Sequence, residues 1–412
     1  MTPSPEHTPP AGAAGGTPTP VHPPAPGGID PSPRTAPVAP PASVAPPAPV
    51  ETWDPLADTR APDDPPLDVL LSGTVFFDLI FTGMDHLPQP GEELWSRGMG
   101  SSPGGIANLA TAAARLGLRT GLVAGFGDDA YGDWMWQMLR DDEHIDLSAS
   151  RRFTNFHSAI TVSVATQDDR AMVTHGHDLP ESLTELVRTA PAARTAIVDL
   201  AGETTWWADL ARRGTLIFAD IGYDETGHWD PADLAPLVHC HAFTPNALEA
   251  VRYTRTDTPD QAVRALAERV PLAVVTDGAE GAYAVDSSTG EEAYCPAVPV
   301  TALDPTGAGD VFAASIVMGT LAQWPLVERL KFASLCAGLA VQQFGGALAA
   351  PGWGDISDWW RAISGRVDGG DLRAAYTRDR YRFLADVLPG RPVQGRRRAQ
   401  GTFAMRSDAG EH

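Results

Sequence analysis

Residues 304–312 read Asp-Pro-Thr-Gly-Ala-Gly-Asp-Val-Phe, a Gly-Ala-Gly turn between two carboxylates that continues into an apolar segment. Glycine lacks a Cβ and tolerates positive φ, so a turn of this composition lets the backbone approach a ligand closely. If a helix begins at this turn, its first N–H groups are unpaired and its dipole favours negative charge. Asp310 would lie at the mouth of that anion site and could accept a proton from an attacking hydroxyl. An anion site beside a carboxylate base is what phosphoryl transfer to an alcohol requires; the competing interpretation is an aspartate that caps an ordinary core helix.

The scarcity of lysine excludes two classes of phosphate-handling protein. Lys331 is the only lysine, and it lies in Glu328-Arg329-Leu330-Lys331-Phe332, which has the composition of a helix flank. A P-loop requires Gly-x-x-x-x-Gly-Lys-Ser/Thr, and the sequence contains no such string. The His-Arg-Asp and Asp-Phe-Gly strings of protein kinases are also absent. Phosphate binding must therefore rest on backbone N–H groups, arginine and a metal ion.

The composition divides the chain into three parts. Residues 1–66 consist mainly of Pro, Ala, Thr, Ser and Gly, and such a segment buries too little apolar surface to offset its ordering entropy. We expect residues 1–66 to form a disordered, partly polyproline arm. Residues 67–365 have globular composition and suffice for one large α/β domain. Residues 366–412 are expected to form a polar C-terminal tail after one short helix.

The net charge and the cysteine pattern limit which partners and which cellular compartment we expect for this chain. The formal net charge of −22 disfavours nonspecific binding to nucleic acid, which depends on phosphate neutralisation. Cys240, Cys295 and Cys336 are widely spaced, a pattern that fits a reducing cytoplasm without a disulfide framework or zinc site. We find no signal-peptide pattern and no apolar run long enough to span a membrane, so no membrane partner is expected.

Short apolar segments alternate with helical patterns in the globular part. The expected strands include residues 68–73, 119–124, 195–200, 215–220, 242–244 and 272–276. Such alternation predicts a parallel sheet that helices cover on both faces. Residues 158–173 alternate apolar and β-branched side chains around Gln167-Asp168-Asp169-Arg170 and predict a hairpin. Ligands of such sheets bind at the carboxyl ends of the strands, where most of the candidate residues fall.

Two groups of residues are candidates for holding a hydroxyl-bearing substrate. Gly104-Gly105 precedes an alanine-rich helical pattern, and the amide of Asn108, one turn later, could bind a hydroxyl. The paired glycines would let the substrate lie against the backbone. Asp78 follows the first strand beside two phenylalanines, where a carboxylate can accept two hydroxyls of a sugar. A solvated asparagine at a glycine-rich helix start and a simple turn aspartate are the competing interpretations.

Two further motifs suit a nucleotide and its metal ion. Asn246 and Glu249 stand at i and i+3 of an expected helix start, so both side chains face the same side. Such a pair can hold Mg²⁺ through water, and it also matches a capping box, so both interpretations stay open. Thr276, Gly278 and Gly281 follow a strand, where the glycines either admit a phosphate or ribose or simply form a turn.

A rival motif occurs at residues 125–130, which read Gly-Phe-Gly-Asp-Asp-Ala. The form Gly-x-Gly-x-x-Ala between a strand and a helix is that of a dinucleotide site and would indicate a Rossmann-type oxidoreductase. Asp128 and Asp129, however, would lie where the pyrophosphate belongs, and their charge would repel it. The sequence therefore favours phosphoryl transfer over this alternative.

Together these motifs resemble the ribokinase-like (PfkB) family of carbohydrate kinases, over about residues 67–360. Residues 304–312 are similar to the family's C-terminal signature, and residues 104–108 are similar to its N-terminal glycine signature. The Asn-x-x-Glu element and the nucleotide loop of the family resemble the motifs at 246–249 and 276–281. Many relatives have an asparagine two residues before the early aspartate, where this chain has Phe76.

The resemblance implies a three-layer α/β/α domain with a central, mostly parallel sheet and a small β lid from about residues 75–100 and 152–175. It implies that Asp310 is the base and that Gly307, Ala308 and Gly309 form the anion hole. The implied acceptor site is Asp78, Gly104, Gly105 and Asn108, and the implied ATP site is Asn246, Thr276, Gly278 and Gly281. Asn246 and Glu249 would hold Mg²⁺ through water, and Asp304 and Thr306 are candidates for binding a monovalent cation such as K⁺. The lid is also a candidate homodimer surface.

The sequence thus predicts a cytoplasmic, ATP-dependent kinase that phosphorylates a hydroxyl of a sugar or nucleoside. The main alternative is a noncatalytic regulator that binds a sugar or nucleotide on the same fold. The acceptor stays open among ribose, fructose, a ketodeoxy acid, a sugar phosphate and a nucleoside.

Overall fold

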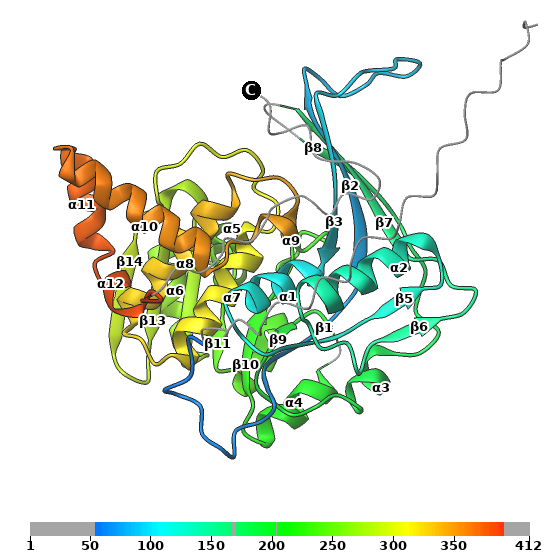
Figure 1. The fold of residues 1–412 in the computed structure, drawn as a ribbon. Coiled ribbons are helices and arrows are strands. Elements are labelled where there is room, and N and C mark those ends of the chain that lie inside the picture. Colours follow the sequence, from blue (N-terminus) through cyan, green and yellow to red (C-terminus); the bar gives the residue numbers. More distant parts are fainter. Residues whose placement is uncertain (1–53, 167–169, 203, 391–412) are drawn as a thin grey trace, which may run out of the picture. The chain divides into compact units, whose positions relative to one another are not determined.

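The computed structural model describes residues 54–166, 170–202 and 204–390, and its centre is an eight-stranded sheet (Figure 1). The strand order is β14-β13-β12-β11-β10-β9-β1-β4. The strands are β1 (Leu67–Ser72), β4 (Thr120–Val123), β9 (Ala193–Asp199), β10 (Leu216–Asp220), β11 (Ala242–Phe243), β12 (Leu272–Thr276), β13 (Ala282–Asp286) and β14 (Glu291–Cys295). All pairs are parallel except those that join β13 to β12 and β14 to β13. The predicted, mostly parallel sheet is confirmed.

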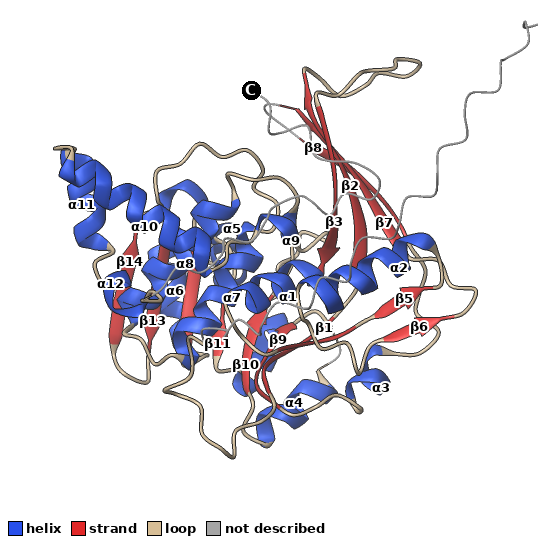
Figure 2. Ribbon diagram, in the orientation of Figure 1, coloured by secondary structure: helices blue, strands red, loops and turns tan. Residues whose placement is uncertain are grey.

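Helices cover both faces of this sheet, as Figure 2 shows. One face packs against α1 (Ile106–Arg115), α2 (Ala130–Gln137), η1 (Met138–Asp142), α7 (Ala308–Leu321), α8 (Leu326–Ala340), α9 (Gly346–Ala349) and α10 (Trp353–Asp368). The other packs against α3 (Leu183–Val187), α4 (Thr205–Arg212), η2 (Pro231–His239), α5 (Ala247–Thr254) and α6 (Pro259–Ala267). Successive strand residues alternate between the two cores, so Val274 lies in the first and Val275 in the second. The result is the three-layer α/β/α architecture.

Helix α7 is buried because it lies among α1, α8 and the sheet. Its sequence, AGDVFAASIVMGTL, is apolar on nearly every side, which is typical of a helix with neighbours all round. Its residues Ile316, Val317 and Met318 are fully buried. This packing holds the first turn of α7, which carries Asp310, in a rigid position.

A second sheet has the strand order β3-β2-β7-β8. Its strands are β2 (Val75–Met84), β3 (Gly98–Gly105), β7 (Ala159–Thr166) and β8 (Arg170–His175). These strands lie in the two segments that the resemblance assigned to a lid, except that β3 continues to Gly105. Residues 152 and 153, at one end of the second expected lid segment, instead belong to β6 (Arg151–Phe153), which pairs with β5 (Gly125–Gly127). The hairpin turn at 167–169 lies outside the described residues.

The folded part is longer than the sequence predicts at both ends. Leu56, placed by the sequence in the N-terminal arm, is fully buried in the first core, and residues 1–53 lie outside the described residues. The predicted tail begins with α11 (Leu372–Arg380) and α12 (Leu384–Val387), and Tyr381 and Leu384 are fully buried. The polar composition of residues 366–380 gave no sign that this segment is part of the folded domain, because Ala374 is the only residue of α11 that is buried. Within the described ranges, no helix has the length and apolarity that crossing a bilayer would need.

Candidate active site

The turn that precedes α7 places backbone N–H groups at the carboxyl edge of the sheet. Gly307 caps the helix with φ of 76°, a conformation that only glycine adopts readily. A Cβ at Gly307 would lie 3.1 Å from the Cα of Gly346, so the turn also needs glycine for space. The N–H of Ala308 donates to the carbonyl of Pro305, whereas Gly309 and Asp310 lie in the first turn, where N–H groups lack intrahelical acceptors. The geometry fits an anion site, with Ala308 engaged in the turn.

Asp310 and Asn108 meet at this turn although 202 positions separate them in the chain. The Nδ2 of Asn108 donates to the Oδ2 of Asp310 at 3.1 Å. Burial raises the pKa of Asp310 to about 6, and the hydrogen bond from Asn108 opposes the rise. The Oδ1 of Asn108 is buried and has no hydrogen-bond partner among the described residues. A buried carbonyl of this kind is an available acceptor for a ligand hydroxyl.

Asp78 lies on β2, and its carboxylate occupies the space that a side chain on Gly104 would need. A Cβ built on Gly104 would lie 1.9 Å from the Oδ2 of Asp78. Burial raises the pKa of Asp78 to about 7, and the nearby carboxylate of Asp304 adds to the rise. Asp78 and the 304–312 turn are therefore close enough to interact electrostatically. Gly105 is the N-cap of α1, with φ of 62°, and a Cβ there would lie 2.5 Å from the carbonyl oxygen of Thr74.

Asp304 ties the turn to the start of α9. Its Oδ1 accepts the N–H of Thr306 at 2.9 Å, and its Oδ2 accepts the N–H of Gly345 at 3.2 Å. The carbonyl of Gly345 in turn accepts the Oγ–H of Ser102 on β3 at 2.8 Å. These bonds connect the second sheet, α9 and the turn before α7. Ser102 and the Gly345-Gly346 pair were not predicted from the sequence, although two adjacent glycines were a visible signal.

Four carboxylates gather where β9 and β10 end. Desolvation raises the pKa of Asp220 well above its usual value, and the carboxylates of Glu249, Asp310 and Asp199 add to this rise. The side chain of Asp220 is nevertheless exposed at the end of β10. Asp199 and Asp220 were not predicted from the sequence, although each is the last residue of a buried strand, where ligands of parallel sheets bind. The cluster is a strongly negative region suited to a cation.

Asn246 and Glu249 form a capping box at the start of α5. The Oδ1 of Asn246 accepts the N–H of Glu249 at 3.0 Å, and the Oε2 of Glu249 accepts the N–H of Asn246 at 2.9 Å. Burial raises the pKa of Glu249. Within the part of the chain that the structure describes, no three His, Cys, Asp or Glu side chains converge tightly enough to hold a metal ion directly. The carboxylate of Glu249, near those of Asp199 and Asp220, fits Mg²⁺ that keeps its water shell.

The predicted nucleotide loop follows β12 beside α5. Thr276 forms an isolated bridge with Asn246, so these two candidate residues are adjacent. Gly278 has φ of 51°, with open space where its Cβ would be. Gly281 differs, because a Cβ there would lie 2.2 Å from the carbonyl oxygen of Cys295. Packing against β14 is therefore sufficient to explain Gly281, and no ligand is needed.

At the rival motif, residues 125–130, the protein's own groups occupy the space that a dinucleotide phosphate would need. Gly125–Gly127 is the strand β5, and Asp129 caps α2 by accepting the N–H of Gly132 at 2.7 Å. A Cβ on Gly127 would lie 2.6 Å from the carbonyl oxygen of Phe156, so this glycine makes room for backbone. A dinucleotide phosphate has no place at this turn, which removes the support for an oxidoreductase.

Residues 68–352 match a protein-family model that is described as "pfkB family carbohydrate kinase". The chain belongs to this family. The match includes the second sheet, the turn before α7 and the nucleotide loop, and it ends where α10 is about to begin. The family resemblance and the enzyme class inferred from the sequence are thus confirmed.

Named relatives of this pfkB-family chain are sugar and nucleoside kinases. It is 24% identical over 310 residues to a 5-dehydro-2-deoxygluconokinase of Geobacillus kaustophilus, covering 69% of this chain and 91% of the relative. It is 30% identical over 278 residues to a fructokinase of Klebsiella pneumoniae, covering 62% and 88%. A ribokinase of Arabidopsis thaliana, solved with ribose and ATP, superimposes with a TM-score of 0.58 at 22% identity, covering 71% of this chain and 98% of that one. The last likeness shows that the fold is shared.

Proposed function

We propose that this chain transfers the γ-phosphoryl group of ATP to a hydroxyl of a sugar or nucleoside. The observation that carries the proposal is the pair of Asp310 and Asn108 at the start of α7, beside N–H groups that lack intrahelical acceptors. A half-buried carboxylate with a pKa of about 6 is ionised at neutral pH and retains enough basicity to accept a hydroxyl proton. The named relatives, which include ribokinases, a fructokinase and a nucleoside kinase, support this class of acceptor.

The acceptor is proposed to lie between the second sheet and α1. Asp78 and the free Oδ1 of Asn108 would accept its hydroxyl protons, and the backbone of Gly104 and Gly105 would lie against its ring. Asp310 would then take the proton of the hydroxyl that attacks phosphorus. Closure of the second sheet over the acceptor would exclude water and so suppress ATP hydrolysis.

ATP is proposed to lie along the ends of β11 and β12. Thr276, Gly278, Gly281 and Asn246 would contact the nucleotide, and the N–H groups of residues 307–310 would bind the transferring phosphoryl group. Asn246 and Glu249 would hold Mg²⁺ through water, and a bound Mg²⁺ supplies charge neutralisation for the phosphates. Asp304 and Thr306 remain our candidates for a monovalent cation site, and the second sheet remains our candidate dimer surface.

ADP release from Mg-ATP, measured across a panel of sugars, sugar phosphates and nucleosides, tests the proposal. We expect one acceptor class to give turnover, and Asp310→Asn to lower kcat by about 10²–10⁴-fold while ADP binding persists. Asp368→Asn is the matched control, because Asp368 is exposed at the end of α10 and forms no hydrogen bond or ion pair with a described site residue. Near-normal turnover in Asp310→Asn would show that another group takes the proton. Silence across the panel, with ATP still bound, would favour the noncatalytic regulator.

A further inference from the structure

A cavity of about 720 Å³ lies at the edge of the main sheet opposite to the candidate active site. It is lined by the first residues of β9 and β10, whereas Asp199 and Asp220, at the other ends of these strands, belong to the active-site cluster. A strand of seven residues, the length of β9, spans about 20 Å. The cavity is therefore separate from the site of phosphoryl transfer, and both can be filled at once.

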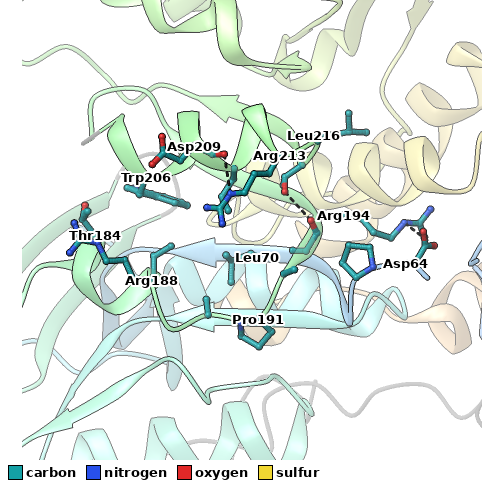
Figure 3. Close-up of a pocket in the computed structure, with 18 of the residues that line it drawn as sticks. Asp64, Leu70, Thr184, Arg188, Pro191, Arg194, Trp206, Asp209, Arg213 and Leu216 are labelled. Atoms are coloured by element: carbon teal, nitrogen blue, oxygen red, sulfur yellow. Dashed lines mark hydrogen bonds and ion pairs between the residues drawn. The ribbon is translucent and has the colours of Figure 1, made fainter. Parts of the chain in front are cut away.

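Three arginines converge on this cavity in a chain whose net charge is −22. Figure 3 shows Arg188 and Arg213 toward one end of the pocket and Arg194 with Asp64 at the other. The Oδ2 of Asp64 lies 3.5 Å from the Nε of Arg194. The other acidic residue of the lining, Asp209, forms an ion pair with Arg212, which does not line the cavity. The acidic groups of the lining are thus already engaged with arginine.

Two of the three arginines have binding capacity left. Arg213 donates its Nε–H to the backbone carbonyl of Asp209 at 3.2 Å, and no described residue pairs with its Nη groups. The guanidinium of Arg188, just after α3, makes no hydrogen bond or ion pair with any described residue. Guanidinium groups bind phosphate oxygens in pairs through their planar fork of donors. The charge of the cavity therefore selects an anion, and its donors fit a phosphate group.

The rest of the lining suits a planar organic group. Trp206 is a partly buried wall of the cavity, next to Arg188 and Arg213 in Figure 3. Apolar side chains from β1, α3, α4 and β10 complete the lining, namely Leu70, Val187, Leu210 and Leu216. Indole rings stack on nucleobases, and a volume of this size accommodates a ligand as large as a nucleotide. An inorganic anion alone would leave this apolar surface exposed to water.

We propose that this cavity is a second nucleotide site, in which Arg188 and Arg213 bind the phosphate groups and Trp206 contacts the base. It is independent of the site proposed for catalysis. Leu321, the last residue of α7, also lines the cavity. A nucleotide bound there would therefore touch the far end of the helix whose first turn carries Asp310.

The test compares ADP binding by the full chain with binding by the double variant Arg188→Gln, Arg213→Gln, using equilibrium dialysis. Both side chains are exposed, so the substitutions should leave the fold intact. The control is Arg373→Gln, Arg382→Gln, which removes the same charge from two exposed arginines of the C-terminal segment. We expect the unmodified chain and the control to bind one more equivalent of ADP than the Arg188, Arg213 variant, or to bind that equivalent at least about tenfold more tightly.

Two further probes assign the chemistry. Inorganic phosphate should displace the arginine-dependent equivalent of ADP, and adenosine, which lacks phosphate, should not bind with the same arginine dependence. Equal ADP binding by the unmodified chain and the Arg188, Arg213 variant would overturn the proposal, as would an equal loss in the control. If the proposed kinase function is wrong, the unmodified chain and the Arg188, Arg213 variant would both lack the equivalent of ADP bound at the candidate active site. The difference in ADP binding between them would stay the same.

Discussion

At Asp310, two requirements on one carboxyl group oppose each other. A proton acceptor must be ionised, yet the protein around Asp310 resists ionisation and raises its pKa to about 6. The amide of Asn108 donates to the carboxylate and so favours the charged form. The balance leaves a base that is mostly ionised at pH 7 and more basic than an exposed aspartate.

The pH dependence of kcat/KM should report this residue. Because the ionised form of Asp310 is the active one and its pKa is raised, activity should increase with pH through about 6 and level off above it. Asp78, whose pKa is raised to about 7, should add a second rise if its ionised form binds the acceptor. Initial rates between pH 5 and pH 9 check this, and a profile that is flat below pH 6 would contradict the assigned base.

Gly104 is a second residue with a sharp prediction. Gly104→Ala places a Cβ 1.9 Å from the carboxylate of Asp78, so the carboxylate must move away from the acceptor. We expect a loss of kcat/KM of about 10²-fold with a normally folded chain, as a misplacement of about 1 Å can produce. Gly365→Ala is the control, since a Cβ there meets open space and alanine favours a helix such as α10. Acceptor kinetics and circular dichroism of both variants provide the measurement.

Among the elements, α9 depends on one buried ion pair. Arg115, at the end of α1, binds Glu143 through Nε at 3.0 Å and Nη2 at 2.6 Å. Its Nη1 also donates to the carbonyls of Leu348 and Ala350, at the end of α9. The other end of α9 holds Gly345 and Gly346 beside the active-site turn, so Arg115 anchors a helix that borders the site.

Removing one partner of this pair should be strongly destabilising. Glu143→Gln leaves the buried guanidinium without its counter-charge, and we expect a loss of about 3–5 kcal/mol in the free energy of unfolding. Asp141→Asn is the control, because Asp141 pairs with Arg140 on the surface and such pairs contribute about 0–1 kcal/mol. Urea unfolding of both variants provides the measurement, and equal midpoints would show that the Arg115–Glu143 pair does not stabilise the fold.

For the whole molecule, the C-terminal segment completes the first core. Tyr381 contacts Trp359 of α10, and Phe383 contacts Trp324, which follows α7. Leu384 is fully buried beside them. The domain thus extends past the end of the family match at residue 352, and it needs this extension to cover the outer side of its helices.

Leu384→Ala tests that extension. Loss of a fully buried leucine should lower the free energy of unfolding by about 2–5 kcal/mol through the cavity left behind. Leu372→Ala, at the start of α11, should have little effect because this leucine is 85% exposed. Thermal unfolding of the two variants gives the comparison. If Leu384→Ala unfolds at the temperature of the unmodified chain, the segment is not part of the cooperative unit.

Much of the fold and part of the site were predictable because their signals are local. The apolar run that contains Val274 and Val275 predicts a strand buried on both faces, and the two residues do lie in different cores. The spacing of Asn246 and Glu249 predicts their capping box. The acidic cluster was not predictable in this way. Asp199 and Asp220 belong to different strands and become neighbours only when the sheet pairs β9 with β10.

The sequence by itself determined the parallel sheet, the turn before α7 and the family, because each depends on residue types within a few positions of one another. Only the tertiary structure decided that Asn108 donates to Asp310, that Gly104 makes room for Asp78, and that residues 381–384 complete the core. Those contacts join segments distant in the chain, and packing of whole elements sets their geometry. The cavity lined by Arg188 and Arg213 is of the same kind, since its walls come from separate strands and helices that meet at the opposite edge of the sheet.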